Sequence, residues 1–227
     1  MKIEIKRDKN SFVIKGACLD ACFNVLGPVM TNSYVLTDGE STIAVDPSAD
    51  ADKIIAMLKG KKLDAIFVTH HHHDHTGALK ELRDKTGAKV YASEVDATII
   101  ENQTPGDPYL SAESCPVDVK LRDKDKVRVG SLVWKVIATP GHTPGSICFF
   151  LDSEQTNHPE RPHLLISGDT LFCGTIGRTD FEGGNIKDMR ASLRKLSQLP
   201  GDTLVLPGHN SLTTIQDEQR RVFAYYC

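Results

Sequence analysis

Short apolar runs rich in β-branched residues alternate with amphipathic segments along most of the chain. Runs such as 63–68, 164–166 and 203–206 have the length and composition of buried strands. Caps, helical spacing of apolar residues and glycine stops predict helices over residues 50–59, 77–85, 94–101, 185–198 and 216–226. This alternation of strands and helices indicates an α/β architecture, with the helices packed on the outside of sheets.

Two stretches predict antiparallel strands. Residues 1–47 contain alternating and apolar segments around the turn Asp38-Gly39, as expected at the antiparallel edge of a sheet. Residues 117–119, 127–129 and 132–138 are separated by charged turns. They predict a meander that forms a second sheet.

Length and composition indicate a single domain spanning residues 1–227. The net charge is −3, and the scatter of Lys and Arg argues against a nucleic-acid partner. No apolar run is long enough to cross a bilayer, and the first residues lack the apolar stretch of a secretion signal. We therefore expect a cytoplasmic protein without a membrane partner. Six cysteines without a Cys-x-x-Cys pair favour free thiols over a disulfide framework.

The stretch 69–75, Thr-His-His-His-His-Asp-His, directly follows the predicted strand 63–68. In an extended segment, side chains two apart point the same way, so His70, His72 and Asp74 can share one side. Imidazoles with a carboxylate are ligands that zinc prefers. A solvated loop or a purification tag is the alternative. A tag would lie at a terminus, and crowded imidazoles without a cation repel one another when protonated.

Further histidines and aspartates follow other predicted strands. His142 lies in a turn held by two prolines and two glycines after residues 132–138, and Asp169 and His209 each come shortly after an apolar run. Asp46 closes the strand 42–45. It could hydrogen-bond to a ligand histidine from behind, or it could be only a turn residue. Strand ends therefore present candidate ligands to one edge of the sheets.

The motif His-x-His-x-Asp-His at 70–75, followed by His142, Gly-Asp-Thr-Leu-Phe at 168–172 and Gly-His at 208–209, resembles the metallo-β-lactamase superfamily over nearly the whole chain. The resemblance implies an αββα sandwich of two mixed β-sheets with outer helices. It also implies a dinuclear centre at one sheet edge. Carried over residue by residue, the first metal would take His70, His72 and His142, the second would take Asp74, His75 and His209, and Asp169 would bridge the two.

Two divalent cations fit this set chemically, with zinc expected and iron or manganese as alternatives. Three imidazoles leave one position of a tetrahedral zinc open for water, and a bridging carboxylate offsets the charge of two cations about 3.5–4 Å apart. Water held there can lose a proton near neutral pH and attack a carbonyl. Asp74 would be catalytic as well as a ligand, because it would orient that nucleophile. A purely structural zinc site would instead be closed and four-coordinate.

Within the superfamily, the segments 139–146, 168–172 and Gly-Arg-Thr-Asp at 177–180 look like the glyoxalase II group, which hydrolyses glutathione thioesters. True glyoxalase II enzymes carry a helical extension after the Gly-His segment, whereas here one short helix, 216–226, is predicted after His209, so we expect a short protein without that extension. We therefore expect a short hydrolase of a small-molecule thioester or related ester, and glutathione is not assured as the thiol.

A persulfide dioxygenase that uses one iron held by two histidines and an aspartate is the alternative, as is a hydrolase of another ester or lactone. A true β-lactamase is disfavoured, because those enzymes generally carry Cys or Ser where Asp169 stands. Arg178 could clamp a substrate carboxylate or pair with Asp180. Tyr109 and Cys173 are weaker candidates for the pocket wall. The sequence gives no indication of the oligomeric state.

Overall fold

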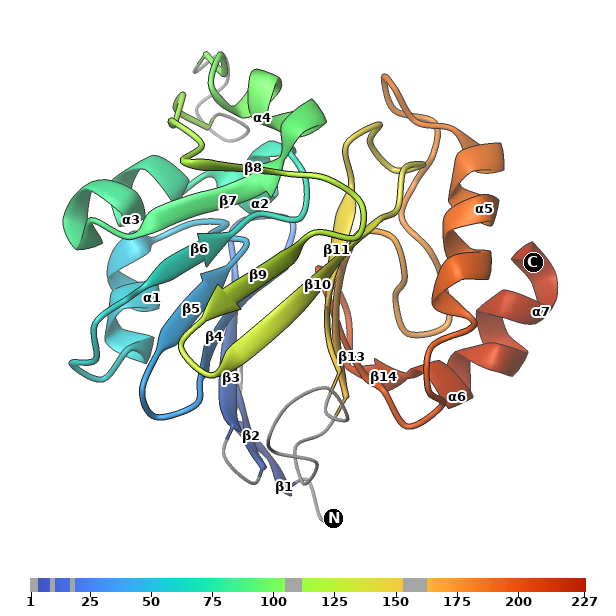
Figure 1. Cartoon of the computed structure of the whole chain (residues 1–227), viewed down its shortest axis with the longest axis horizontal. Coiled ribbons are helices and arrows are strands. Elements are labelled where there is room, and N and C mark those ends of the chain that lie inside the picture. Colours follow the sequence, from blue (N-terminus) through green and yellow to red (C-terminus); the bar gives the residue numbers. More distant parts are fainter. Residues whose placement is uncertain (1–3, 9–10, 17–18, 105–111, 153–162) are drawn as a thin grey trace.

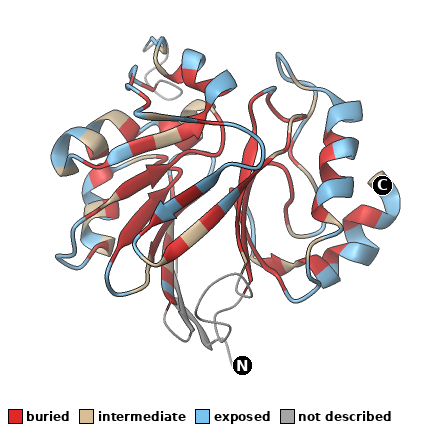
Figure 2. Cartoon of the chain, viewed as in Figure 1, coloured by how far each residue is buried: buried red, intermediate tan, exposed pale blue. Residues whose placement is uncertain are grey.

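The computed structural model describes residues 4–8, 11–16, 19–104, 112–152 and 163–227 of the chain (Figure 1). Two β-sheets face each other across a shared core, and helices cover the outer face of each sheet. The helices bury the side that faces a sheet and expose the other side (Figure 2). Both sheets are mixed. The four-layer αββα sandwich predicted from the sequence is therefore confirmed.

The first sheet has eight strands in sequence order, β1 to β8. Pairing is antiparallel from β1 to β5 and parallel from β5 to β8. The strands are β1 (Glu4–Asp8), β2 (Ser11–Gly16), β3 (Leu19–Leu26), β4 (Thr31–Thr37), β5 (Thr42–Val45), β6 (Ala65–Phe67), β7 (Lys89–Ser93) and β8 (Val119–Leu121). Helices α1 (Ala51–Met57), α3 (Leu79–Thr86) and α4 (Glu94–Ile100) pack on its outer face, and the short α2 (His73–Thr76) precedes α3.

The second sheet has six strands in the order β14-β13-β12-β11-β10-β9, and only β12 and β13 pair in parallel. Its strands are β9 (Lys126–Val129), β10 (Leu132–Ala138), β11 (Ile147–Leu151), β12 (Leu164–Gly168), β13 (Leu204–Pro207) and β14 (Thr213–Thr214). Its outer face is covered by α5 (Ile186–Leu196) and by the C-terminal α6 (Ile215–Glu218), a π-helix (Gln219–Phe223) and α7 (Ala224–Tyr226).

Aromatic side chains between the sheets fix how the two sheets lie against each other. The Phe67 ring stacks on Phe149 with centroids 4.4 Å apart and meets the edge of Trp134 at 6.0 Å. All three side chains are fully buried. Because Phe67 ends β6, this packing holds the histidine-rich segment that follows it against the second sheet.

The helix starts predicted at residues 50, 94 and 185 agree with the structure to within one residue, but residues 73 and 74, expected to be extended, lie in α2, and the helix expected from residue 77 begins at Leu79. Asp50, Ser93 and Asn185 are N-caps whose side chains accept hydrogen bonds from backbone N–H groups of the first helical turn. Within the described part of the chain, no helix combines the length and apolar character needed to cross a membrane. The described cysteines are free thiols, as expected, and Cys18 lies outside the described residues.

One strand prediction was wrong, and one strand was missed. The segment around residue 119 does not join a meander in the second sheet, since β8 pairs in parallel with β7 in the first sheet. Asp118 anchors it there by accepting hydrogen bonds from Val90 N at 2.8 Å and from the Arg83 guanidinium. Strand β3 was not predicted individually, because polar residues such as Asp20 and Asn24 interrupt its apolar pattern.

Candidate metal centre

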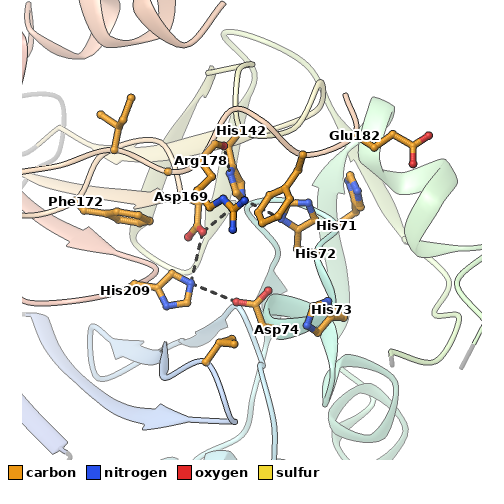
Figure 3. Close-up of a pocket in the computed structure, with 14 residues that line it drawn as sticks. His71, His72, His73, Asp74, His142, Asp169, Phe172, Arg178, Glu182 and His209 are labelled. Atoms are coloured by element: carbon orange, nitrogen blue, oxygen red, sulfur yellow. Dashed lines mark hydrogen bonds and ion pairs between the residues drawn. The ribbon is translucent and has the colours of Figure 1, made fainter. Parts of the chain in front are cut away.

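Seven histidine and aspartate side chains meet at the edge of the sandwich where four strands end. Figure 3 shows five of them, His72, Asp74, His142, Asp169 and His209. Residues 70–75 follow β6, His142 follows β10, Asp169 follows β12, and His209 follows β13. In the described part of the chain, their ligand atoms form three overlapping groups, and the atoms of each group lie within 4.8 Å of one another. The groups are His70, His72 and His142; His70, His75 and Asp169; and Asp74, His75 and His209. The fold thus brings together all seven residues that the sequence suggested as ligands.

The first group consists of three imidazoles, of His70, His72 and His142. His72 Nδ1 and His142 Nε2 lie 2.8 Å apart, and His142 Nδ1 lies 2.7 Å from the backbone oxygen of Arg178. Burial lowers the pKa of His70 well below its ordinary value, and the neighbouring His75 adds to this effect. Burial and the nearby His142 lower the pKa of His72 to about 3. Both side chains therefore keep lone pairs available at neutral pH.

The second group combines a carboxylate with two basic imidazoles. Asp74 Oδ2 lies 3.2 Å from His209 Nε2 and 3.4 Å from His75 Nε2. Burial raises the pKa of Asp74, but the contacts of its carboxylate with the His209 and His75 imidazoles outweigh burial and hold this pKa well below its usual range. Burial lowers the pKa of His209, but Asp169 and Asp74 outweigh it and raise this pKa to about 9.

Asp169 lies between the two groups. Its Oδ1 is 3.2 Å from His75 Nε2, and its Oδ2 is 3.4 Å from His142 Nε2 and 3.5 Å from His209 Nε2. Burial raises the pKa of Asp169, but the positive charge of His75 and further histidine contacts hold it well below its usual range. One ionised carboxylate therefore contacts imidazoles of both groups.

The cluster fits a pair of cations. Among the described residues, His70 Nε2, His75 Nε2 and Asp169 Oδ1 are buried without an aligned hydrogen-bond partner. Such orphaned polar atoms are costly unless something satisfies them. A cation among them would do so, and imidazole nitrogen with carboxylate oxygen is a donor set for zinc or iron. The arrangement therefore suggests a dinuclear metal site without specifying the metal.

Asp46 supports two of the histidines from behind. Its backbone is left-handed, with φ of 46°, and its side chain is buried. Oδ1 accepts a hydrogen bond from Thr69 N at 2.8 Å, and Oδ2 accepts from Thr69 Oγ1 at 2.7 Å and lies 2.9 Å from His75 Nδ1. Thr69 Oγ1 in turn lies 3.1 Å from His70 Nδ1. An acceptor behind Nδ1 keeps the proton there and directs the Nε2 lone pair into the cluster.

Asp96 is a supporting residue that was not predicted. This fully buried residue of α4 accepts hydrogen bonds at Oδ2 from His71 N and Thr143 Oγ1, each at 2.9 Å. It therefore links the segment that carries His70 and His72 to the turn that carries His142. The sequence pattern that could have identified Asp96 is its position beside Ala97 and Ile100 on the buried face of a helix, where an unpaired carboxylate is rare.

Strand β4 supports the second group. Thr31 Oγ1 donates to Asp74 Oδ2 at 2.9 Å, and Asn32 N donates to the backbone oxygen of Gly208 at 2.7 Å. Gly208 itself leaves no room for a side chain, because a Cβ would lie 2.3 Å from Asp169 Oδ1 and 2.6 Å from His75 Cε1. The loop after β13 must therefore approach the cluster as bare backbone.

Five members of the cluster line a pocket of about 640 Å³: His72, Asp74, His142, Asp169 and His209. Arg178 also lines this pocket, but its Nε and Nη2 donate to Asp180 at 2.9 and 2.8 Å. Of the two roles suggested for Arg178, pairing with Asp180 is the one seen in the structure. Cys173 follows the lining residue Phe172 without lining the pocket itself, and Tyr109 lies outside the described residues.

Relatives of this chain include hydrolases. A probable metallo-hydrolase of Bacillus subtilis, YqgX, is 34% identical over 201 residues, which is 86% of this chain and 92% of that protein. The hydroxyacylglutathione hydrolase of Chromohalobacter salexigens is 38% identical over 172 residues, which is 75% of this chain but only 57% of that protein.

Solved structures show the same fold. The B3 metallo-beta-lactamase BLEG-1 has a TM-score of 0.77 and 35% identity, with coverage of 89% of this chain and 98% of its own. The di-iron-bound form of TTHA1623 has a TM-score of 0.72 and 32% identity, with coverage of 87% and 96%. ETHE1 from Myxococcus xanthus has a TM-score of 0.65 and 30% identity, with coverage of 97% and 83%. Residues 26–209 match the family model described as the Metallo-beta-lactamase superfamily. The chain belongs to the metallo-beta-lactamase superfamily.

Proposed function

We propose that this protein is a metal-dependent hydrolase that cleaves a small-molecule thioester or related ester with two divalent cations in the cluster. The observation that carries the proposal is the position of Asp169, which lies within 3.5 Å of His75, His142 and His209 and so contacts both groups. A carboxylate shared by two imidazole groups is suited to hold two cations side by side.

The residues would divide the work as follows. His70, His72 and His142 would hold one cation, and Asp74, His75 and His209 the other, with Asp169 between them. Bound cations would lower the pKa of a coordinated water and polarise the substrate carbonyl. Asp74 stays ionised and accepts a hydrogen bond from the Thr31 hydroxyl, so its carboxylate is fixed as an acceptor that can orient the attacking water.

The names of two relatives support hydrolysis as the type of reaction. Among the relatives, one is named a probable metallo-hydrolase and another a hydroxyacylglutathione hydrolase. The second match spans 57% of that protein. We therefore propose thioester hydrolysis as the reaction. The identity of the thiol is inferred from the residues that line the pocket.

Oxidation of a persulfide at a single iron is the second candidate. It needs two histidines and an aspartate on one metal, and the group of His70, His75 and Asp169 supplies such a set. A di-iron-bound neighbour shows that iron is compatible with this fold. Metal content distinguishes the two candidates.

Metal analysis of the purified protein, combined with turnover of S-lactoylglutathione, an aryl ester and a chromogenic β-lactam, tests the proposal. We expect two metal ions per chain and hydrolysis of the thioester or the aryl ester. Asp169→Asn should lose both metal and turnover, whereas the exposed Asp202→Asn should lose neither. One iron per chain, with oxygen consumption on glutathione persulfide and no hydrolysis, would refute the proposal in favour of the second candidate.

A further inference from the structure

Apolar side chains surround the cluster at the pocket mouth. Val29, Phe172, Ile176 and Phe181 all line the pocket. Figure 3 labels Phe172 near His209. Val29 and Phe181 are 47% and 43% exposed. Large apolar groups that converge on a pocket, rather than scattering singly over a surface, mark a place where a ligand binds.

The two aromatic rings stand at opposite ends of the ligand cluster. The Phe172 ring meets His209 edge-on, with centroids 5.7 Å apart. The Phe181 ring meets His72 at 5.6 Å and His142 at 6.1 Å. A carbonyl bound at the cluster would therefore have one apolar wall beside each of its two substituents.

Beyond the candidate ligands, charge in the described lining does not favour an anionic substrate. Bound cations would offset the charge of Asp74 and Asp169, and the rest of the described lining holds one carboxylate, Glu182, and one arginine or lysine, Arg178. Asp180 already takes two nitrogens of that guanidinium, whose carbon lies 4.2 Å from the centre of the Phe181 ring. The Arg178–Asp180 ion pair is exposed and weak. A substrate carboxylate that bound Arg178 would have to displace the Asp180 carboxylate, so it would gain little binding energy.

From this arrangement we propose that the pocket selects thioesters or esters whose acyl and thiol or alcohol portions are both apolar and uncharged. The inference rests on the proposed hydrolase function and narrows its substrate class. Phe172 would contact the portion beside His209, and Phe181 the portion beside His72 and His142. Glutathione, which carries two carboxylates, would then be a poor thiol.

Matched substrates test the charge preference. S-butyryl-N-acetylcysteamine and S-succinyl-N-acetylcysteamine differ only in a terminal methyl or carboxylate, and S-butyrylglutathione changes only the thiol. We expect kcat/KM to be higher by about tenfold or more for the butyryl ester of N-acetylcysteamine than for either charged substrate, since small apolar groups in such pockets carry preferences of this size. Equal or inverted preference would overturn the proposal.

Variants test the residues. Phe181→Ser removes an exposed ring and should lower about tenfold the preference for S-butyryl-N-acetylcysteamine over one charged substrate: over the succinyl thioester where the ring contacts the acyl portion, or over the glutathione thioester where it contacts the thiol portion. Tyr225→Ser, at a 76% exposed position on α7, is the control and should change neither. Asp180→Asn should free Arg178 and raise kcat/KM for the succinyl substrate severalfold. Unchanged selectivity in both Phe181→Ser and Asp180→Asn would contradict the assignment of these residues.

Binding separates the substrate class from the reaction. Absence of turnover with all esters would refute the proposed function, and non-hydrolysable thioether analogues of the three substrates would then still report on the pocket. Thermal stabilisation by the butyl thioether of N-acetylcysteamine, but not by its carboxylated counterpart, would support an apolar pocket. Equal or greater stabilisation by the carboxylated analogue or the glutathione thioether would overturn it.

Discussion

Asp46→Asn tests whether the support behind the candidate ligands determines metal binding. The Asp46 carboxylate contacts Thr69 N at 2.8 Å, Thr69 Oγ1 at 2.7 Å and His75 Nδ1 at 2.9 Å. Asparagine has the same shape and tolerates the φ of 46° found here, so the backbone should stay in place. The amide, however, has one accepting oxygen and one donating nitrogen, so it cannot accept on both sides.

The structure sets the size of the expected effect. The variant can keep its oxygen on Thr69 N, which turns the NH2 group toward Thr69 Oγ1 and His75 Nδ1. Losing one charge-assisted hydrogen bond should lower the free energy of unfolding of the metal-free protein by about 2 kcal/mol. An amide donor facing Nδ1 also favours the His75 tautomer with its proton on Nε2. That nitrogen would then have no lone pair for a metal, so affinity should fall about 10- to 100-fold.

Urea unfolding of the metal-free protein measures the first effect, and competition with a chromophoric chelator measures the second. Asp20→Asn, at an exposed position of β3, is the matched control and should change neither quantity. Metal affinity within twofold of the parent protein, at whatever stability, would refute the reasoning, because it would show that Asp46 does not set the state of His75.

Three further predictions address the same centre and the contact between the sheets. Gly208→Ala would place a Cβ 2.3 Å from a carboxylate oxygen of the cluster and should reduce metal content and turnover more than tenfold. Gly201→Ala is the control and should change neither, because its Cβ would lie 3.5 Å from the nearest atom. Burial lowers the pKa of His209, but neighbouring carboxylates raise it to about 9, so a metal that binds His209 must displace a proton. Titration calorimetry should show proton release and a metal affinity that rises up to tenfold per pH unit between about pH 6 and 9. A metal affinity that does not change with pH would contradict this prediction. Burial raises the pKa of Asp38, but hydrogen bonds led by Ser131 lower it from 3.8 to about 2, so its contribution is present above about pH 4 and is lost as the pH falls toward 2. Asp38→Asn should therefore cost about 1 kcal/mol of unfolding free energy at pH 7 and almost nothing at pH 2, and equal losses at both values would count against this role.

The candidate ligands could be predicted from the sequence because each of them follows an apolar strand closely. His70 comes three residues after β6 ends, and Asp169 comes directly after β12. Strand and ligand therefore appear together in one short window of sequence. The αββα layers could be predicted for a related reason, since helical and strand periodicities are local signals.

Sheet membership could not be predicted in the same way. The strands β8 and β9 are separated by only a few residues, yet they belong to different sheets. What decides between the sheets is a contact far away in sequence, the hydrogen bond from Val90 N to the Asp118 carboxylate. The hydrophobic pattern of so short a strand with polar neighbours does not indicate which strand it pairs with.

The supporting carboxylates show where local reasoning stops. Asp46 and Asp96 both accept hydrogen bonds from the segment that bears the histidines, at residues 69 and 71 respectively. Asp46 closes a strand, as the ligands do, and was therefore found as a candidate. Asp96 lies on a helix, and its partners His71 and Thr143 are 25 and 47 residues away. Only its buried charge could have identified it, because a fully buried carboxylate must be held by hydrogen bonds whose donors come from elsewhere in the fold. A carboxylate on the apolar face of a short helix in this fold should therefore be tested for contact with the ligand loops before it is assigned to the surface.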